Sequence, residues 1–229
     1  DYARQGEQRL TSMLRLLARD GVQADPEALR TSLRSAGARF DHHWRRNERF
    51  AAADAIELVL AEQSLTVSDA MRRDLVALIT DPDEEHDPDP TPNVGDALEA
   101  LRSAGVRIGI ICDVGLAPST TLRRILARHG LLGFFDHWSF SDDVGTFKPD
   151  PVIFEHALAG LGGVSADRAA HVGDLRRTDI AGANAMGITS VRYTGAFDDP
   201  GSSDDGTDAV EARVVLGDHA DLVAALGIG

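Results

Sequence analysis

The chain contains 229 residues, 43% of them hydrophobic, which is enough for one large or two smaller domains with a real core. Its formal net charge of -14 argues against binding to nucleic acid or to an anionic membrane, because such surfaces require clustered lysine and arginine. A single cysteine, Cys112, excludes an intrachain disulfide framework, and no apolar run approaches the roughly 18 residues of a membrane helix, so we expect a cytoplasmic protein.

The N-terminal part of the chain is predicted to be helical. Apolar residues recur there at three- and four-residue spacing between turn signals. The pattern predicts helices over residues 8–17, 26–46, 51–63 and 68–79. Asp25 ahead of Pro26 is a typical N-cap with proline at the first helical position.

A proline-rich acidic stretch follows these helices. Residues 81–92 read DPDEEHDPDPTP, and so many prolines cannot continue a helix. We therefore expect a linker between a helical domain and a second domain.

Beyond the linker, short apolar strands alternate with helices. Strands are predicted over residues 106–112, 137–140, 169–173, 188–193 and 213–216, and helices over residues 94–103, 119–129, 151–161, 180–186 and 219–226. Near-continuous apolar strands, each followed by a helix, are typical of a parallel sheet covered on both faces. The fold class is therefore α/β with a helical appendage, and residues beyond the carboxyl ends of the strands are the first candidates for function.

A second acidic segment, residues 198–208, follows the fourth predicted strand. It is rich in Gly, Ser and Asp, a composition that buries too little apolar surface to offset the entropy of ordering. We therefore expect a mobile loop there.

Lys148 is the only lysine among the 23 basic side chains of lysine and arginine. It lies in a short loop, VGTFKPDP, that closes on a proline turn. An ammonium group is a compact charge that can approach a carboxylate or phosphoryl oxygen without a planar partner. At this point two interpretations stay open: lysine is a chemical requirement, or it is the survivor of a codon usage that depletes lysine.

Carboxylates follow two other predicted strands. Asp113 comes directly after Cys112, and Asp174 comes directly after Gly173. Asp179 follows across a turn that leads into the next helix. A strand-to-helix loop can bring two carboxylates to one point, and hard oxygen ligands meeting at a loop are what Mg²⁺ selects. The sequence therefore predicts a magnesium site on Asp174 and Asp179.

These residues have structural alternatives. Asp179 can simply cap the helix that follows it. Cys112 is more readily a small buried side chain than a reactive thiol. His171, inside a predicted strand, is interpreted as a core histidine and not as a ligand.

Together the three segments resemble motifs two, three and four of the haloacid dehalogenase (HAD) superfamily. The matching residues are Cys112 and Asp113 for the second motif, Lys148 and Pro149 for the third, and Gly173, Asp174 and Asp179 for the fourth. The resemblance covers most of the chain. Residues 1–81 are similar to an inserted helical cap, residues 82–92 form the linker, and residues 93–229 are similar to the Rossmann-like core without its first strand.

The resemblance implies a Mg²⁺-dependent phosphatase of a small phosphorylated metabolite that works through an aspartyl-phosphate intermediate. A carboxylate that attacks a phosphoryl group brings two anions together, so positive charge must neutralise both. By resemblance, Lys148 supports the nucleophile and the phosphoryl oxygens, while Asp174 and Asp179 hold the Mg²⁺.

The second motif departs from the family pattern. Cys112 and Asp113 stand where a Ser or Thr hydroxyl and the following amide usually bind the phosphoryl group. A thiol is a weaker donor than a hydroxyl. We therefore expect either that the backbone amides of Asp113 and Val114 make this contact or that the substrate differs.

The family's first motif, an apolar strand ending in Asp-x-Asp with the nucleophile first, has no match in the chain. We expect the nucleophile to lie upstream of Asp1. Two alternatives stay open: a noncatalytic binding protein on the same fold, and a haloacid dehalogenase, whose reaction needs no metal and would leave Asp174 and Asp179 without a task.

Overall fold

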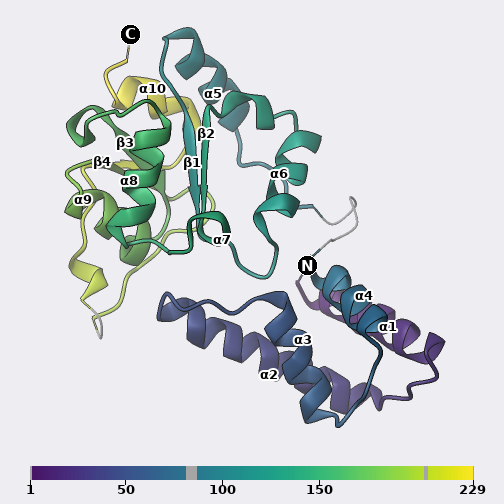
Figure 1. Ribbon diagram of the computed structural model, residues 1–229. Coiled ribbons are helices and arrows are strands. Elements are labelled where there is room, and N and C mark those ends of the chain that lie inside the picture. Colours follow the sequence, from purple (N-terminus) through teal and green to yellow (C-terminus); the bar gives the residue numbers. More distant parts are fainter. Residues whose placement is uncertain (1, 81–86, 204–205, 229) are drawn as a thin grey trace. The chain divides into compact units, whose positions relative to one another are not determined.

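The computed structural model describes residues 2–80, 87–203 and 206–228, and it divides the chain into two compact units (Figure 1). The helical unit comprises Asp1–Pro88 and Val114–Leu122, and the α/β unit comprises Asp89–Asp113 and Arg123–Gly229. Much of the linker predicted at residues 82–92 falls on residues 81–86, which lie outside the described ranges. Within those ranges, no helix combines the length and the apolar character needed to cross a lipid bilayer.

The helices of the first eighty residues follow the pattern that the sequence predicts. They are α1 (Tyr2–Arg19), α2 (Pro26–Arg45), α3 (Ala52–Glu62) and α4 (Asp69–Thr80). Local capping fixes the helix starts. The carboxylate of Asp25 accepts a hydrogen bond from the amide of Ala28 at the start of α2, and the carboxylate of Asp54 accepts one from the amide of Ala51 at the start of α3.

The apolar faces of these helices share one core. Helix α2 packs against α3, and α1 packs against α4. The largest fully buried side chains of this core are Met13, Leu17, Leu29, Ile56 and Leu75. The later segment Val114–Leu122 belongs to the same unit: Leu116 packs against this core, and the hydroxyl of Thr121 donates to the carbonyl of Thr80 at 2.7 Å.

Parallel strands form the centre of the α/β unit, in two sheets. Strand β1 (Gly109–Cys112) pairs with β2 (His137–Phe140), while β4 (Thr189–Tyr193) lies between β3 (Ala170–Gly173) and β5 (Val214–Leu216). The predicted α/β class with a parallel-sheet core is confirmed. The strands do not form one continuous sheet, since within the described ranges neither β1 nor β2 pairs with β3, β4 or β5.

Helices and short turns connect the strands. The helices are α5 (Val94–Ser103), α6 (Ser119–Arg128), α7 (Ser141–Val144), α8 (Pro151–Gly160), α9 (Ala181–Ala185) and α10 (Leu222–Ala225). The turns are the 3₁₀-helices η2 (Leu132–Phe134), η3 (Ala166–Arg168), η5 (Thr207–Ala209) and η6 (His219–Asp221), and the π-helical turn η4 (Arg176–Ile180). The predicted helix over residues 219–226 is therefore split into η6 and α10, and the single turn α7 was not predicted.

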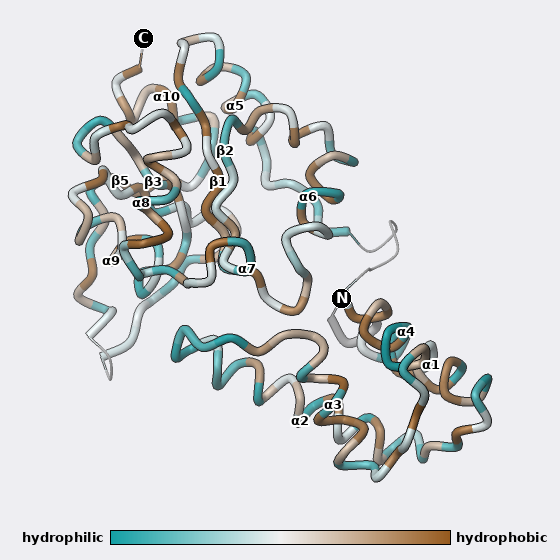
Figure 2. Tube along the Cα trace, viewed as in Figure 1, coloured by the Kyte–Doolittle hydropathy of each residue, from teal (hydrophilic) through white to brown (hydrophobic). Residues whose placement is uncertain are grey.

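Apolar clusters hold α5, α8, α9 and α10 on the strands. One cluster contains Leu98, Leu101, Ile108, Val191, Tyr193, Leu216 and Leu222. The other joins Ile111 of β1 to Ile153, Phe154, Ala183 and Ile188, and Figure 2 shows the hydrophobic runs of β1 and α8. Since α8 packs on β1 and β2 while α9 packs on β4, the second cluster connects the two sheets through their covering helices.

Candidate active site at the carboxyl ends of the strands

A buried ion pair joins two of the predicted site residues. The Nζ of Lys148 donates to Oδ1 of Asp179 at 2.7 Å, and the two side chains are only 10% and 3% exposed. The Nε2 of His171 lies 2.8 Å from the same oxygen, and its ring packs edge-on against Phe154. The candidate site is therefore built on a buried cluster of Lys148, Asp179 and His171, which we call the lysine cluster.

The local fold fixes the carboxylate of Asp179. Its second oxygen, Oδ2, accepts the amide hydrogen of Leu175 at 3.2 Å and lies 3.4 Å from the hydroxyl of Thr178. Gly173 makes room for it, because a Cβ at that position would lie 2.2 Å from Cγ of Asp179. Both oxygens of Asp179 are thus engaged by protein groups, and its bond to the preceding Leu175 amide does not cap the helix that follows.

The charges in the lysine cluster stabilise one another. Burial alone would raise the pKa of Asp179, but Lys148 and the hydrogen bond from His171 hold that pKa well below its usual range. Burial alone would likewise lower the pKa of Lys148, but the carboxylates of Asp179 and Asp113 raise it above its ordinary value. Both groups are therefore charged at neutral pH.

Asp113 lies beside the same lysine. Its Oδ1 accepts a hydrogen bond from the backbone amide of Lys148 at 2.9 Å. Burial raises the pKa of Asp113, and the nearby charge of Lys148 opposes that rise. The end of β1 is thereby joined to the Lys148 loop, with Cys112 as the last residue of the strand and Val114 directly after Asp113.

Asp174 differs from Asp179 in its partners. Among the described residues it forms no ion pair, and burial followed by the charge of Asp179 raises its pKa. A partly buried carboxylate in a negative potential suits a small divalent cation with oxygen ligands. The described ranges contain no group of three or more His, Cys, Asp or Glu side chains arranged to hold a metal ion.

The structure thus brings together Lys148, Asp113 and Asp179, with Asp174 on the turn just before Asp179 and Cys112 within electrostatic reach of Lys148. From the sequence His171 is interpreted as a core residue, and its contact with Asp179 is not predicted. A signal was present: His171 and Gly173 lie two residues apart in a strand and share one face, and Gly173 is where Asp179 packs.

Burial raises the pKa of the Cys112 thiol to about 11, although the charge of Lys148 acts against this rise. At pH 8 the thiolate fraction is then about a hundredfold below that of an ordinary thiol, and only the thiolate is nucleophilic. We therefore expect Cys112 in the folded protein to react with iodoacetamide about a hundredfold more slowly than Cys112 in the urea-unfolded protein. Mass spectrometry of samples taken over time measures the two rates. Equal rates in the two states would contradict the protected thiol.

Comparison with known proteins adds to this geometry. Residues 7–187 match a family model described as haloacid dehalogenase-like hydrolase. A glyceraldehyde 3-phosphate phosphatase of Methanopyrus kandleri is 37% identical over 119 residues, which cover 51% of this chain and 49% of that protein. Haloacetate dehalogenase H-2 of Moraxella sp. is 30% identical over 129 residues, 55% of each protein. The crystal structure of the putative HAD-hydrolase YfnB of Bacillus subtilis bound to magnesium has a TM-score of 0.65 at 15% identity, over 100% of this chain and 93% of that one, which is a likeness of fold.

The chain spans about half the length of the curated relatives that it matches. The family model in contrast matches most of the chain and includes β1, β2, β3 and the turn that carries Asp174 and Asp179. The family expected from the sequence is therefore confirmed, and the chain belongs to the haloacid dehalogenase-like hydrolases.

Proposed function

We propose that the protein is a Mg²⁺-dependent phosphatase of a small phosphorylated metabolite, acting through an aspartyl-phosphate intermediate. The observation that carries the proposal is the lysine cluster, in which a buried ammonium group is held charged next to Asp113. A fixed cation at the carboxyl ends of parallel strands is what a reaction between two anions requires. The similarity to a glyceraldehyde 3-phosphate phosphatase supports the same substrate class.

Each residue has a proposed role. Asp179 and His171 hold the ammonium group of Lys148 in place, so that it neutralises the attacking carboxylate and the phosphoryl oxygens without reorganising. The backbone amides of Asp113 and Val114 bind the phosphoryl group, and Cys112 has a structural role as a free, largely buried thiol. Asp174 would hold Mg²⁺, with Asp179 as the second predicted ligand; the ion supplies charge neutralisation at the transferred group.

The nucleophile is proposed to be an aspartate at the end of a further parallel strand upstream of Asp1. Strands β1 and β3 each have one edge without a strand neighbour in the described ranges, and α8 and α9 already link their sheets through the cluster around Phe154. A parallel strand pairing with both edges would place its last residue beside Lys148 and Asp113. Reading the codons upstream of Asp1 for an apolar strand ending in Asp-x-Asp tests this directly.

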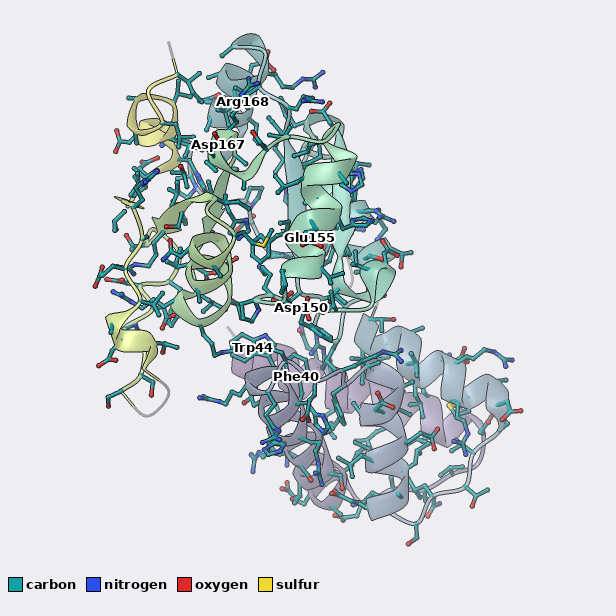
Figure 3. All side chains as sticks on the ribbon, turned by 60° about the vertical axis from the view of Figure 1, so that its left-hand side comes forward. Phe40, Trp44, Asp150, Glu155, Asp167 and Arg168 are labelled. Carbon is teal, nitrogen blue, oxygen red and sulfur yellow. The ribbon has the colours of Figure 1, made fainter. Side chains whose placement is uncertain are left out.

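Asp174→Asn is expected to abolish Mg²⁺-dependent hydrolysis of p-nitrophenyl phosphate by the protein translated from its own start codon. The loss should reach about a hundredfold or more, because the amide cannot replace the charge of a metal-binding carboxylate. The control is Asp167→Asn, whose exposed carboxylate lies in η3, at the opposite end of the unit from Asp150 (Figure 3). Full activity in Asp174→Asn, or turnover that persists in EDTA, would contradict the metal-dependent mechanism.

The similarity to haloacetate dehalogenase H-2 favours a second candidate function. A dehalogenase would release halide from a haloacid in EDTA and would tolerate Asp174→Asn. A noncatalytic binding protein would turn over neither substrate and would lack an upstream Asp-x-Asp. The same assay panel therefore separates the three functions.

A further inference from the structure

Arg176 lies on the turn between Asp174 and Asp179, and it binds a segment that is distant in the sequence. Its backbone amide donates to Oδ2 of Asp199 at 2.7 Å, and its Nε donates to the carbonyl of Asp199 at 2.9 Å. Its Nη1 donates to the carbonyl of Val210 at 2.6 Å. One residue thus fastens two points of the segment after β4 to the turn, and we call Arg176, Asp199 and Val210 the arginine clamp.

The clamp is buried and chemically specific. The side chain of Arg176 is only 12% exposed. Nε and Nη1 donate from two separate nitrogens of a rigid planar group to the carbonyls of Asp199 and Val210, whereas all three donors of a lysine ammonium lie on one nitrogen. A buried guanidinium group without hydrogen-bond acceptors costs free energy of folding. The contacts of Arg176 with Asp199 and Val210 therefore restrict the positions of all three residues.

Further contacts hold the described parts of this segment. Asp199 accepts the amide hydrogen of Gly201 at 2.9 Å through its other oxygen. Arg192 of β4 forms an ion pair with Asp198, and the side chain of Asn184 donates to the carbonyl of Glu211 at 2.9 Å. Within the segment 198–208, which the sequence predicts to be a mobile loop, Asp198 is bonded to β4 and Asp199 to the turn.

The clamp adjoins the candidate metal ligands along the chain. Arg176 lies two residues after Asp174 and three residues before Asp179, so its hydrogen bonds to Asp199 hold the turn between them. Groups that fix a ligand-bearing turn from outside the ligand shell commonly tune metal affinity.

We propose that Arg176 is a positioning residue that, by holding Asp199 and Val210, fixes the turn carrying Asp174 and Asp179 and so sets the affinity of the site for Mg²⁺. The part that concerns Mg²⁺ rests on the proposed function. The attachment of the segment to the turn does not.

The test compares Arg176→Met and Arg176→Lys with the matched control Arg168→Met, whose arginine is exposed in η3 (Figure 3). The first readout is hydrogen exchange without metal at the amides of residues 174–180, 198–203 and 206–211. The second is calorimetric titration with Mg²⁺. We expect faster exchange in both regions and about tenfold weaker Mg²⁺ binding in Arg176→Met, partial rescue in Arg176→Lys, and no change in the control.

The outcomes are distinguishable. Unchanged exchange in Arg176→Met would overturn the clamp itself. Faster exchange with unchanged Mg²⁺ affinity would overturn the positioning role. Failure of the unsubstituted protein, translated from its own start codon, to bind Mg²⁺ would sink the proposed function and this use of the clamp, while the exchange data would still decide whether the clamp exists.

Discussion

Asp179→Ala is expected to destabilise the α/β unit by about 3–5 kcal/mol, the cost of removing one partner from a buried ion pair. The substitution leaves the ammonium of Lys148 and the ring of His171 facing each other without the carboxylate that they share. The amide of Leu175 and the hydroxyl of Thr178 lose their acceptor as well. Urea unfolding followed by circular dichroism measures the change in the free energy of unfolding.

The control for this prediction is Asp167→Ala. Asp167 is an exposed carboxylate on η3 in the same unit, and its removal should change the free energy of unfolding by at most about 0.5 kcal/mol. If the two substitutions cost the same, the lysine cluster does not contribute to stability as its burial indicates.

An acid titration adds a second measurement to the same pair of variants. Because the folded-state pKa of Asp179 is lowered, its stabilising contribution is fully present above the ordinary pKa range of an aspartate. The contribution declines as the pH falls from that range toward the folded-state value. The unsubstituted protein and Asp167→Ala should therefore lose stability more steeply on acidification than Asp179→Ala, and parallel slopes would contradict the lowered pKa.

Lys148→Arg is expected to reduce kcat/KM for an aryl phosphate by about a hundredfold or more, the usual cost of losing one preorganised group that stabilises the transition state. Arginine keeps the positive charge but not the shape. The Oδ1 of Asp179 is already shared with His171, so a guanidinium at this position would bury several donors without acceptors. The measurement is steady-state kinetics on the protein translated from its own start codon.

Two comparisons separate chemistry from folding in this variant. Thermal unfolding must show that Lys148→Arg is still folded at the assay temperature. Arg168→Lys, the reverse exchange at an exposed position, should leave kcat/KM unchanged. Undiminished activity of Lys148→Arg would mean that the chain's single lysine reflects codon usage and not the requirements of the site.

Much of the fold could be predicted because its signals are local. The bounds of α5 and β2 agree with the sequence pattern, and α8 begins at Pro151, where Asp150 caps the amide of Val152. The carboxylates at the strand ends were found for the same reason, since an apolar run that ends in a polar residue is visible in the sequence.

The rest depends on contacts between distant segments. His171 shares a strand face with Gly173, but the sequence does not show that the carboxylate of Asp179 packs on that face. The two carbonyls that hold Arg176 come from residues far along the chain and carry no sequence signature, because every residue has a carbonyl group. The division of the strands into two sheets is likewise a property of pairing, which the apolar character of each strand does not encode.

The burial of Lys148 has a consequence for covalent labelling. Amine-reactive esters acylate the exposed lysines of most proteins, but here the side chain of the single lysine is only 10% exposed and bonded to a carboxylate. Such reagents therefore find no accessible lysine in the folded chain. The rate at which Lys148 is acylated would then measure how often the site opens to solvent.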